Sequence, residues 1–292
     1  MSVVERSFST ATHFIRKLRG SSQPVLVRAD DGALYVAKFA DNLQGGNLLF
    51  NEAMGAELYQ ACGLTVPSWK PLLLTSEFLD QQPGLWIESE KGLRRPSEGL
   101  CFGSRYVGSD EAQVYEILPA GSFPRICNRE HFWLSWLIDI CADHADNRQA
   151  LFVEGADGRL LTYFIDHGHL FGGPGGNGKM HFTGSRYLDL RIYPQLSSKH
   201  LAVLVRVLAS TDERAIRRRL LSVPDEWKTA SALDRLENCL SRLVDRRLLG
   251  NLLETIGNSI AGRGDDDNLA RRCGYRSQTV GLRAGVQPTV SF

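Results

Sequence analysis

One stretch near the start of the chain constrains the fold most. Residues 25–39, VLVRADDGALYVAKF, alternate between apolar and polar side chains on both sides of an Asp-Gly pair, which predicts a β-hairpin with strands at 25–29 and 33–39. After a polar, glycine-bearing loop, residues 48–63, LLFNEAMGAELYQACG, carry apolar side chains at helical spacing and stop at Gly63. The sequence therefore predicts a hairpin followed by a helix that packs against a sheet.

The pattern of apolar and polar residues changes after the loop AGSFPRICN. Residues 130–144, EHFWLSWLIDICADH, are apolar on most faces, as is typical of a helix buried at the centre of a domain. Residues 148–168 read as a second hairpin, and three segments within 195–260 have the 3.6-residue rhythm of amphipathic helices. These patterns predict an α+β chain in three parts: a small sheet-containing lobe, a larger and mainly helical lobe, and a mobile tail, at residues 1–125, 126–262 and 263–292.

The charge and cysteine content of the chain point to no particular class of partner. The 292 residues include 34 Lys and Arg against 33 Asp and Glu, so the net charge of +1 gives no reason to expect direct binding to nucleic acid or to a membrane surface. The six cysteines form no C-x-x-C pair, and we expect them to be reduced thiols. Neither a signal peptide nor a membrane-spanning apolar run is present, which predicts a cytoplasmic protein.

Two charged residues in the first lobe suit phosphate chemistry. Phosphoryl transfer from ATP needs a lysine that holds phosphate oxygens, an acid that orients this lysine, an acid that holds magnesium, and an acid near the attacking hydroxyl. Lys38 lies near the end of the second hairpin strand, in YVAKF, and Glu52 follows 14 residues later in the helix. A strand lysine opposite a helix glutamate predicts an ion pair.

Three further stretches could complete such a site. Residues 142–152, ADHADNRQALF, concentrate polar side chains after a buried helix, and burying them without partners would cost several kcal/mol. Asp166 ends an apolar strand in YFIDHG, where a carboxylate suits a hard cation such as Mg²⁺. Four residues before the first hairpin strand could bring backbone N–H groups to phosphates: Gly20, Ser21, Ser22 and Gln23.

Taken together, four stretches resemble the HipA-like kinase domain: GSSQPVLVRADDGALYVAKF, NLLFNEAMGAELYQACGLTVP, DNRQALF and YFIDHGHLF. The resemblance covers residues 18–260 and implies a bilobal protein-kinase-like fold that uses ATP and Mg²⁺. Members of this family resemble bacterial serine/threonine kinases of toxin–antitoxin systems. The implied partners are therefore ATP, a phosphoacceptor that is a protein or a small molecule, and an antitoxin-type protein.

The resemblance also implies roles for individual residues. Lys38 would contact the ATP phosphates together with the loop from Gly20 to Gln23, Glu52 would orient Lys38, and Asp166 would hold magnesium.

The segment expected to be the catalytic loop departs from the family pattern, in which an Asp is followed five residues later by an Asn. The fifth residue after Asp143 is Arg148, and the fifth after Asp146 is Leu151. If Gln149 takes the place of the Asn, Asp143 is one residue too far from it and Asp146 is two residues too near. Either acid could be the catalytic base.

We favour Asp146 as the base because it follows the predicted helix end, whereas Asp143 lies near its last turn. Asn147 or Gln149 would then give a neutral oxygen to the metal. Arg148 would contact phosphate or pair with one of the two acids.

Two other functions fit the same residues. A pseudokinase, which binds a nucleotide without rapid transfer, would explain the irregular loop. A metal-dependent phosphohydrolase would instead use imidazole and carboxylate ligands drawn from His144, Asp146, Asp166, His167 and His169. That second interpretation gives Lys38 and Glu52 no role.

Overall fold

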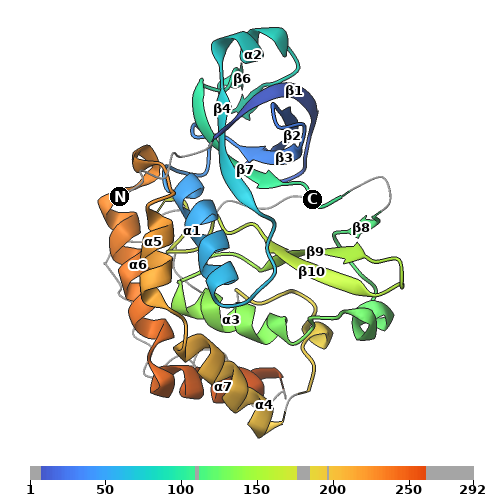
Figure 1. Ribbon diagram of the computed structural model, residues 1–292, viewed down its shortest axis with the longest axis vertical. Helices are drawn as coiled ribbons and strands as arrows, with labels where there is room; N and C mark the ends of the chain where they lie inside the picture. The colour runs from blue at the N-terminus through green and yellow to red at the C-terminus, as the bar shows by residue number, and fades with distance from the viewer. Residues whose placement is uncertain (1–7, 109–111, 176–184, 196, 261–292) are drawn as a thin grey trace.

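The computed structural model describes residues 8–108, 112–175, 185–195 and 197–260. The predicted mobile tail, 263–292, lies outside these residues. Figure 1 shows a small barrel of strands at one end of the molecule, most of the helices at the other, and helix α1 (Leu48–Ala61) between them. The elements that carry the candidate residues meet where these two parts face each other.

The barrel is formed by strands from the first 105 residues. Its neighbouring strands are antiparallel, except that β1 runs parallel to β4 and closes the ring. In barrel order the strands are β1 Ser9–Lys17, β2 Val25–Ala29, β3 Leu34–Lys38, β7 Gly99–Arg105 and β4 Trp69–Leu74. Val25, Val27 and Leu72 are fully buried in the interior, so the barrel has a hydrophobic core of its own.

The first predicted hairpin is confirmed as β2 and β3. Gly32 in the turn has φ +77°, a backbone conformation that glycine adopts without steric cost, and Asp31 Oδ1 accepts a hydrogen bond from Ala33 N–H at 3.0 Å. Val25 pairs with Ala37 at the open end of the hairpin. This register places Lys38 at the last position of β3, next to Phe102 of β7.

The predicted helix is confirmed as α1, and it is buried on nearly every side. Twelve of its 14 residues are buried, and it contacts both β7 of the barrel and helix α5 (Glu213–Leu220). It ends as the sequence predicts, because Gly63 adopts φ +81° and the Leu64 N–H donates to Tyr59 O at 3.0 Å. A helix enclosed in this way holds its polar side chains in fixed positions.

The second part of the molecule surrounds helix α3 (His131–Cys141), which is buried along almost its entire length. The second predicted hairpin is confirmed as β9 (Gln149–Glu154) and β10 (Leu160–Ile165), with Gln149 opposite Ile165. The hydrophobic core around α3 and this hairpin is continuous with the buried residues of α1. The residues between α3 and β9 therefore lie close to those that follow β10.

Shorter elements and the C-terminal helices complete the fold. They are α2 Ser76–Gln81, β5 Ile87–Ser89, β6 Gly92–Arg94, β8 Val114–Tyr115, the 3₁₀ helices Ala120–Arg125, Leu190–Ile192 and Asp225–Trp227, and the helices α4 Ser198–Ala209, α6 Ala230–Leu243 and α7 Arg246–Ile260. The last predicted helical segment is divided into α6 and α7, because Asp245 Oδ1 accepts from the N–H groups of Arg247 and Leu248 and starts a new helix. Within the described ranges, no helix combines the length and the apolar character needed to cross a bilayer.

Candidate functional site

The amine of Lys38 lies between two carboxylates. Lys38 Nζ donates to Glu52 Oε1 in α1 and, at 2.8 Å, to Asp166 Oδ1, the residue that follows β10. Lys38 is 7% exposed and Glu52 is 2% exposed, so both ion pairs are largely shielded from water. The ion pair between Lys38 and Glu52 that the sequence predicts is present, and Asp166 extends it.

The carboxylate of Glu52 also holds the turn that carries Asp166. It accepts hydrogen bonds from His167 N–H at 3.1 Å and from Gly168 N–H at 2.9 Å. Asp166 itself has φ +59°, a conformation that L-residues rarely adopt, so the turn depends on its neighbours. A Cβ on Gly168 would lie 2.8 Å from Glu52 Oε1, which explains why glycine follows the histidine.

The surroundings of the cluster keep Lys38 and Asp166 charged. Burial alone would lower the pKa of Lys38, but the charges of Asp166 and Glu52 outweigh burial and raise that pKa above its ordinary value. Burial would raise the pKa of Asp166, yet the charge and the hydrogen bond of Lys38 hold it well below the usual range. The ammonium of Lys38 and the ionised carboxylate of Asp166 are therefore in direct contact.

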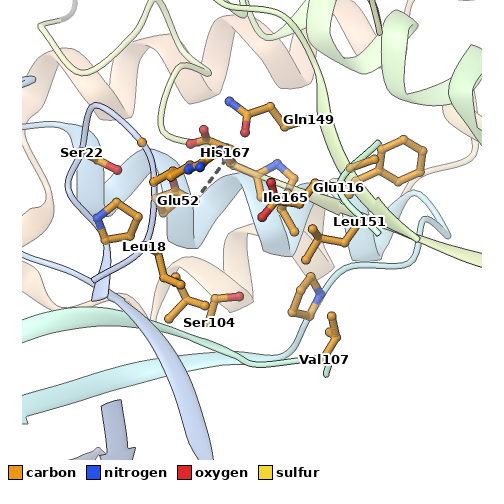
Figure 2. Close-up of a pocket in the computed structure, with 18 of the residues that line it drawn as sticks. Leu18, Ser22, Glu52, Ser104, Val107, Glu116, Gln149, Leu151, Ile165 and His167 are labelled. Atoms are coloured by element: carbon orange, nitrogen blue, oxygen red, sulfur yellow. Dashed lines mark hydrogen bonds between the residues drawn. The ribbon is translucent and has the colours of Figure 1, made fainter. Parts of the chain in front are cut away.

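A cavity of about 910 Å³ opens beside this cluster, between the barrel and the β9–β10 hairpin. Leu18 and Ser104 line it from the barrel side, and Leu151 and Ile165 line it from the hairpin side (Figure 2). Apolar groups make up the larger part of its wall, and Lys38, Glu52 and Asp166 lie together among the charged residues that also line it. A cavity of this volume that combines apolar walls with convergent polar groups is typical of a small-molecule site.

The loop before β2 contributes to the cavity in part. Gly20, Ser21 and Ser22 line it, as expected for a loop that could approach phosphates. Gln23 is used differently, because its side chain exchanges two hydrogen bonds of 2.8 Å with the backbone of Glu88. Gln23 therefore fastens the loop to strand β5.

The two candidate bases differ in their surroundings. Asp143 has φ +50°, and its Oδ2 accepts a hydrogen bond from Arg242 Nη1 of α6 at 2.8 Å. Asp146 lies farther along the loop, is half-buried, and accepts from the N–H of Asn147 at 2.7 Å. Among the described residues, neither acid belongs to the cavity lining.

The two amide side chains proposed as metal ligands are also placed differently. Gln149 is exposed, lines the cavity, and stands opposite Ile165 in the β9–β10 ladder, one residue from Asp166. Asn147 is half-buried and, among the described residues, is not part of the cavity lining. The geometry therefore favours Gln149 over Asn147 as a neighbour of Asp166.

Arg148 does not pair with either loop acid. Its fully buried guanidinium binds Asp139 of α3 in a two-point contact, Nε to Oδ2 at 2.9 Å and Nη2 to Oδ1 at 2.5 Å. The predicted pairing with Asp143 or Asp146 is therefore wrong, because Arg148 points inward from the start of β9 toward α3. Tyr59 of α1 completes the group, donating its O–H to Asp139 Oδ1 at 2.6 Å.

Sequence reasoning missed Asp139 and Tyr59. A signal for Asp139 exists, because it is the single charged residue inside the apolar run FWLSWLIDIC, and a buried acid needs a cationic partner. Tyr59 gives no such signal, since an apolar helix commonly contains a tyrosine.

The histidines of the phosphohydrolase interpretation are not arranged as metal ligands. Burial lowers the pKa of His144 and that of His167 well below the ordinary value, so both rings are neutral. In the part of the chain that the structure describes, no three His, Cys, Asp or Glu side chains gather closely enough to hold a metal ion. The centre that this interpretation requires is not assembled there.

The comparisons with known proteins gave matches among solved structures. No family model and no curated protein matches the sequence. The crystal structure of a Helicobacter pylori proinflammatory kinase, CtkA, matches with a TM-score of 0.53 and 11% identity, over 87% of this chain and 99% of that one. A Golgi casein kinase matches with a TM-score of 0.48 and 13% identity, over 87% of this chain and 76% of that one.

The same Golgi casein kinase with Mn/ADP bound matches with a TM-score of 0.44 and 14% identity, over 86% of this chain and 74% of that one. The similarity to CtkA shows that the mixed helices and sheet of this chain form a kinase-like fold.

Proposed function

We propose that this chain is an ATP- and Mg²⁺-dependent phosphotransferase of the HipA-like type, which transfers phosphate to a serine or threonine hydroxyl of a protein. The observation that carries the proposal is the position of Lys38, held between Glu52 and Asp166 in the wall of the cavity. This combination matches what phosphoryl transfer requires of a protein, a fixed cation and a metal-binding acid beside a nucleotide.

The cavity supports a defined orientation of ATP. In this orientation the purine would contact apolar side chains of the cavity wall, among them Leu18 and Leu151. The phosphates then lie toward Lys38 and beneath the backbone of residues 20–22. Lys38 stays protonated in this position, and it holds phosphate oxygens by charge and hydrogen bonding.

The residues present fit a magnesium–nucleotide complex. Mg²⁺ usually takes one or two protein carboxylates and completes its shell with phosphate oxygens and water, so Asp166 with Gln149 nearby is a sufficient protein contribution. When bound, the metal supplies charge neutralisation for the phosphates. Asp166 faces the cavity edge, with 25% of its side chain exposed, and is already ionised to receive it.

Asp146 is the proposed catalytic base. The carboxylate of Asp143 is engaged by Arg242, and this ion pair ties Asp143 to helix α6. The hydrogen bond described for Asp146 is local, to the next backbone N–H, which leaves carboxylate lone pairs for an acceptor hydroxyl. In this scheme Asp146 takes the hydroxyl proton as the oxygen bonds to the terminal phosphorus of ATP, and the bond from that phosphorus to the bridging oxygen breaks to release ADP.

The proposal includes a bilobal layout that divides near residue 125, with the barrel and α1 covering the nucleotide. An antitoxin-type protein is the proposed regulatory partner, as the resemblance to HipA-like kinases implies.

One observation favours a pseudokinase as the second candidate. Neither loop acid is part of the cavity lining that the structure describes, so a nucleotide could bind without a base close to its terminal phosphate. ATP binding with no phosphate transfer, to the protein itself or to an added protein, would favour this function.

The experiment that tests the proposal measures ATP affinity with and without Mg²⁺ and then phosphate transfer. Lys38→Met should abolish Mg²⁺–ATP binding, because it removes the phosphate-binding charge and keeps an apolar stem of similar length. Lys70→Met is the matched control, since Lys70 on β4 also makes an ion pair, with Asp31 at 2.9 Å, and is not among the described residues that line the cavity. Equal ATP affinity in the two variants would refute the assignment of Lys38.

A further inference from the structure

We infer that Arg148, fixed by Asp139 and Tyr59, is a positioning residue that holds Asp166 in the conformation that binds the metal. The inference rests on the proposed function, since it concerns how the metal-binding acid is kept in place.

The turn that carries Asp166 is held from two sides. From one side, Glu52 accepts hydrogen bonds from the N–H groups of His167 and Gly168. From the other, Arg148 Nη1 donates to the carbonyl oxygen of Ile165 at 2.9 Å, and it lies 3.4 Å from the carbonyl oxygen of Asp166. Arg148 therefore binds the carbonyl side of a turn whose N–H side is bound by Glu52.

This support matters because the turn is not relaxed. Asp166 has φ +59°, and a non-glycine residue in that region is strained and persists only where its surroundings impose it. A relaxed turn would direct the carboxylate elsewhere and break its contact with Lys38. The position of the metal-binding oxygen therefore depends on the groups that grip the backbone on either side.

Arg148 is itself immobilised to an unusual degree. Asp139 binds two nitrogens of its guanidinium, and the guanidinium carbon lies 4.8 Å from the centre of the Tyr59 ring. The same ring contacts the imidazole of His167, with 4.6 Å between ring centres. Tyr59 and Glu52 belong to the same helix, so α1 contributes to both sides of the support.

Stability alone gives a poor reason for this arrangement. Arg148 and Asp139 are fully buried, and a buried ion pair is often no more stabilising than apolar residues of similar volume. A role in fixing the geometry of a metal site accounts for it, because groups that orient a metal ligand commonly change metal affinity about 10- to 100-fold when they are replaced.

The test compares ATP affinity with and without Mg²⁺ in the full chain, alongside urea unfolding. In the double variant Arg148→Met with Asp139→Leu both charges leave together, so the fold should survive while the gain in ATP affinity from Mg²⁺ falls about 10-fold or more. Arg148→Lys keeps the charge and loses the two-point contact, and it should show the same loss. In both variants, the ATP affinity measured without Mg²⁺ should remain close to that of the unaltered protein.

The outcomes separate this inference from the proposed function. Folded variants that keep the full Mg²⁺ gain would overturn the positioning role and leave the proposed function intact. An unaltered protein that binds ATP equally with and without Mg²⁺ would overturn the proposed function, and the inference with it.

Discussion

Gly55 offers the sharpest test of the packing around the site. It lies on α1, three residues after Glu52, where a Cβ would be 2.4 Å from His167 Cβ and 2.6 Å from Leu170 Cδ1. Carbon atoms in contact are normally separated by about 3.5–4.0 Å, so Gly55→Ala must move the helix or the turn by about 1 Å. The site leaves no room for the smallest side chain.

The expected change in the free energy of unfolding is the difference between two opposing effects. Alanine in a helix interior is favoured over glycine by about 0.5–1 kcal/mol, whereas overpacking a close contact costs about 1–3 kcal/mol. The net loss in the free energy of unfolding should be about 1 kcal/mol for Gly55→Ala. ATP affinity in the presence of Mg²⁺ should fall as well, because the displaced elements carry Glu52 and Asp166.

Gly250→Ala is the matched control. Gly250 is an exposed position in α7, with no atom within 4 Å of an added Cβ, so only the helix preference acts and stability should rise by about 0.5–1 kcal/mol. Urea unfolding of both variants gives the comparison. If Gly55→Ala were as stable as Gly250→Ala, the close approach of α1 to the turn would be wrong.

Three further outcomes are expected. Asp166→Asn should weaken ATP binding in the presence of Mg²⁺ more than in its absence, and an equal loss in both titrations would point to a structural role. Asp146→Asn should lower the phosphoryl-transfer rate by about 10²–10⁴ with little change in ATP affinity, and a larger loss in Asp143→Asn would move the base to that residue. Because His144 and His167 are held neutral in the fold, the unfolded state gains protons that the folded state lacks as the pH falls below about 6.5. The free energy of unfolding should therefore decrease from that pH downward, by up to about 1.4 kcal/mol per pH unit for each histidine, and His144→Leu should remove about half of the slope in pH-dependent urea titrations.

The sequence predicted those parts of the fold that depend on neighbouring residues. The hairpin that ends at Lys38 and the helix that carries Glu52 each have a local pattern and a glycine at the turn or at the end. Strand β1 was missed because its residues STATHFIRK do not alternate cleanly between apolar and polar, although it pairs with the next strand, β2. Its pairing with β4, which closes the barrel, joins segments about 60 residues apart. Closure of the barrel is therefore a tertiary effect.

The same distinction applies to the site. Lys38 and Glu52 lie 14 residues apart on adjacent elements, and their ion pair follows from that order. Arg148 was expected to contact phosphate or to pair with an acid of its own loop. It pairs with Asp139 of α3 instead, and that choice depends on how the second part of the chain packs. The spacing of the acids in the loop carries no information about this choice.

The burial of α1 has a consequence for how the molecule unfolds locally. Although α1 belongs to the first quarter of the sequence, Leu48, Phe50 and Met54 are buried in the same core as Trp136 and Leu240, while the barrel interior is separate. In native-state hydrogen exchange, the amides of α1 should therefore exchange together with those of α3, and those of β2 can exchange independently. The helix that carries Glu52 therefore belongs to the C-terminal cooperative unit, although it precedes the rest of that unit in the sequence.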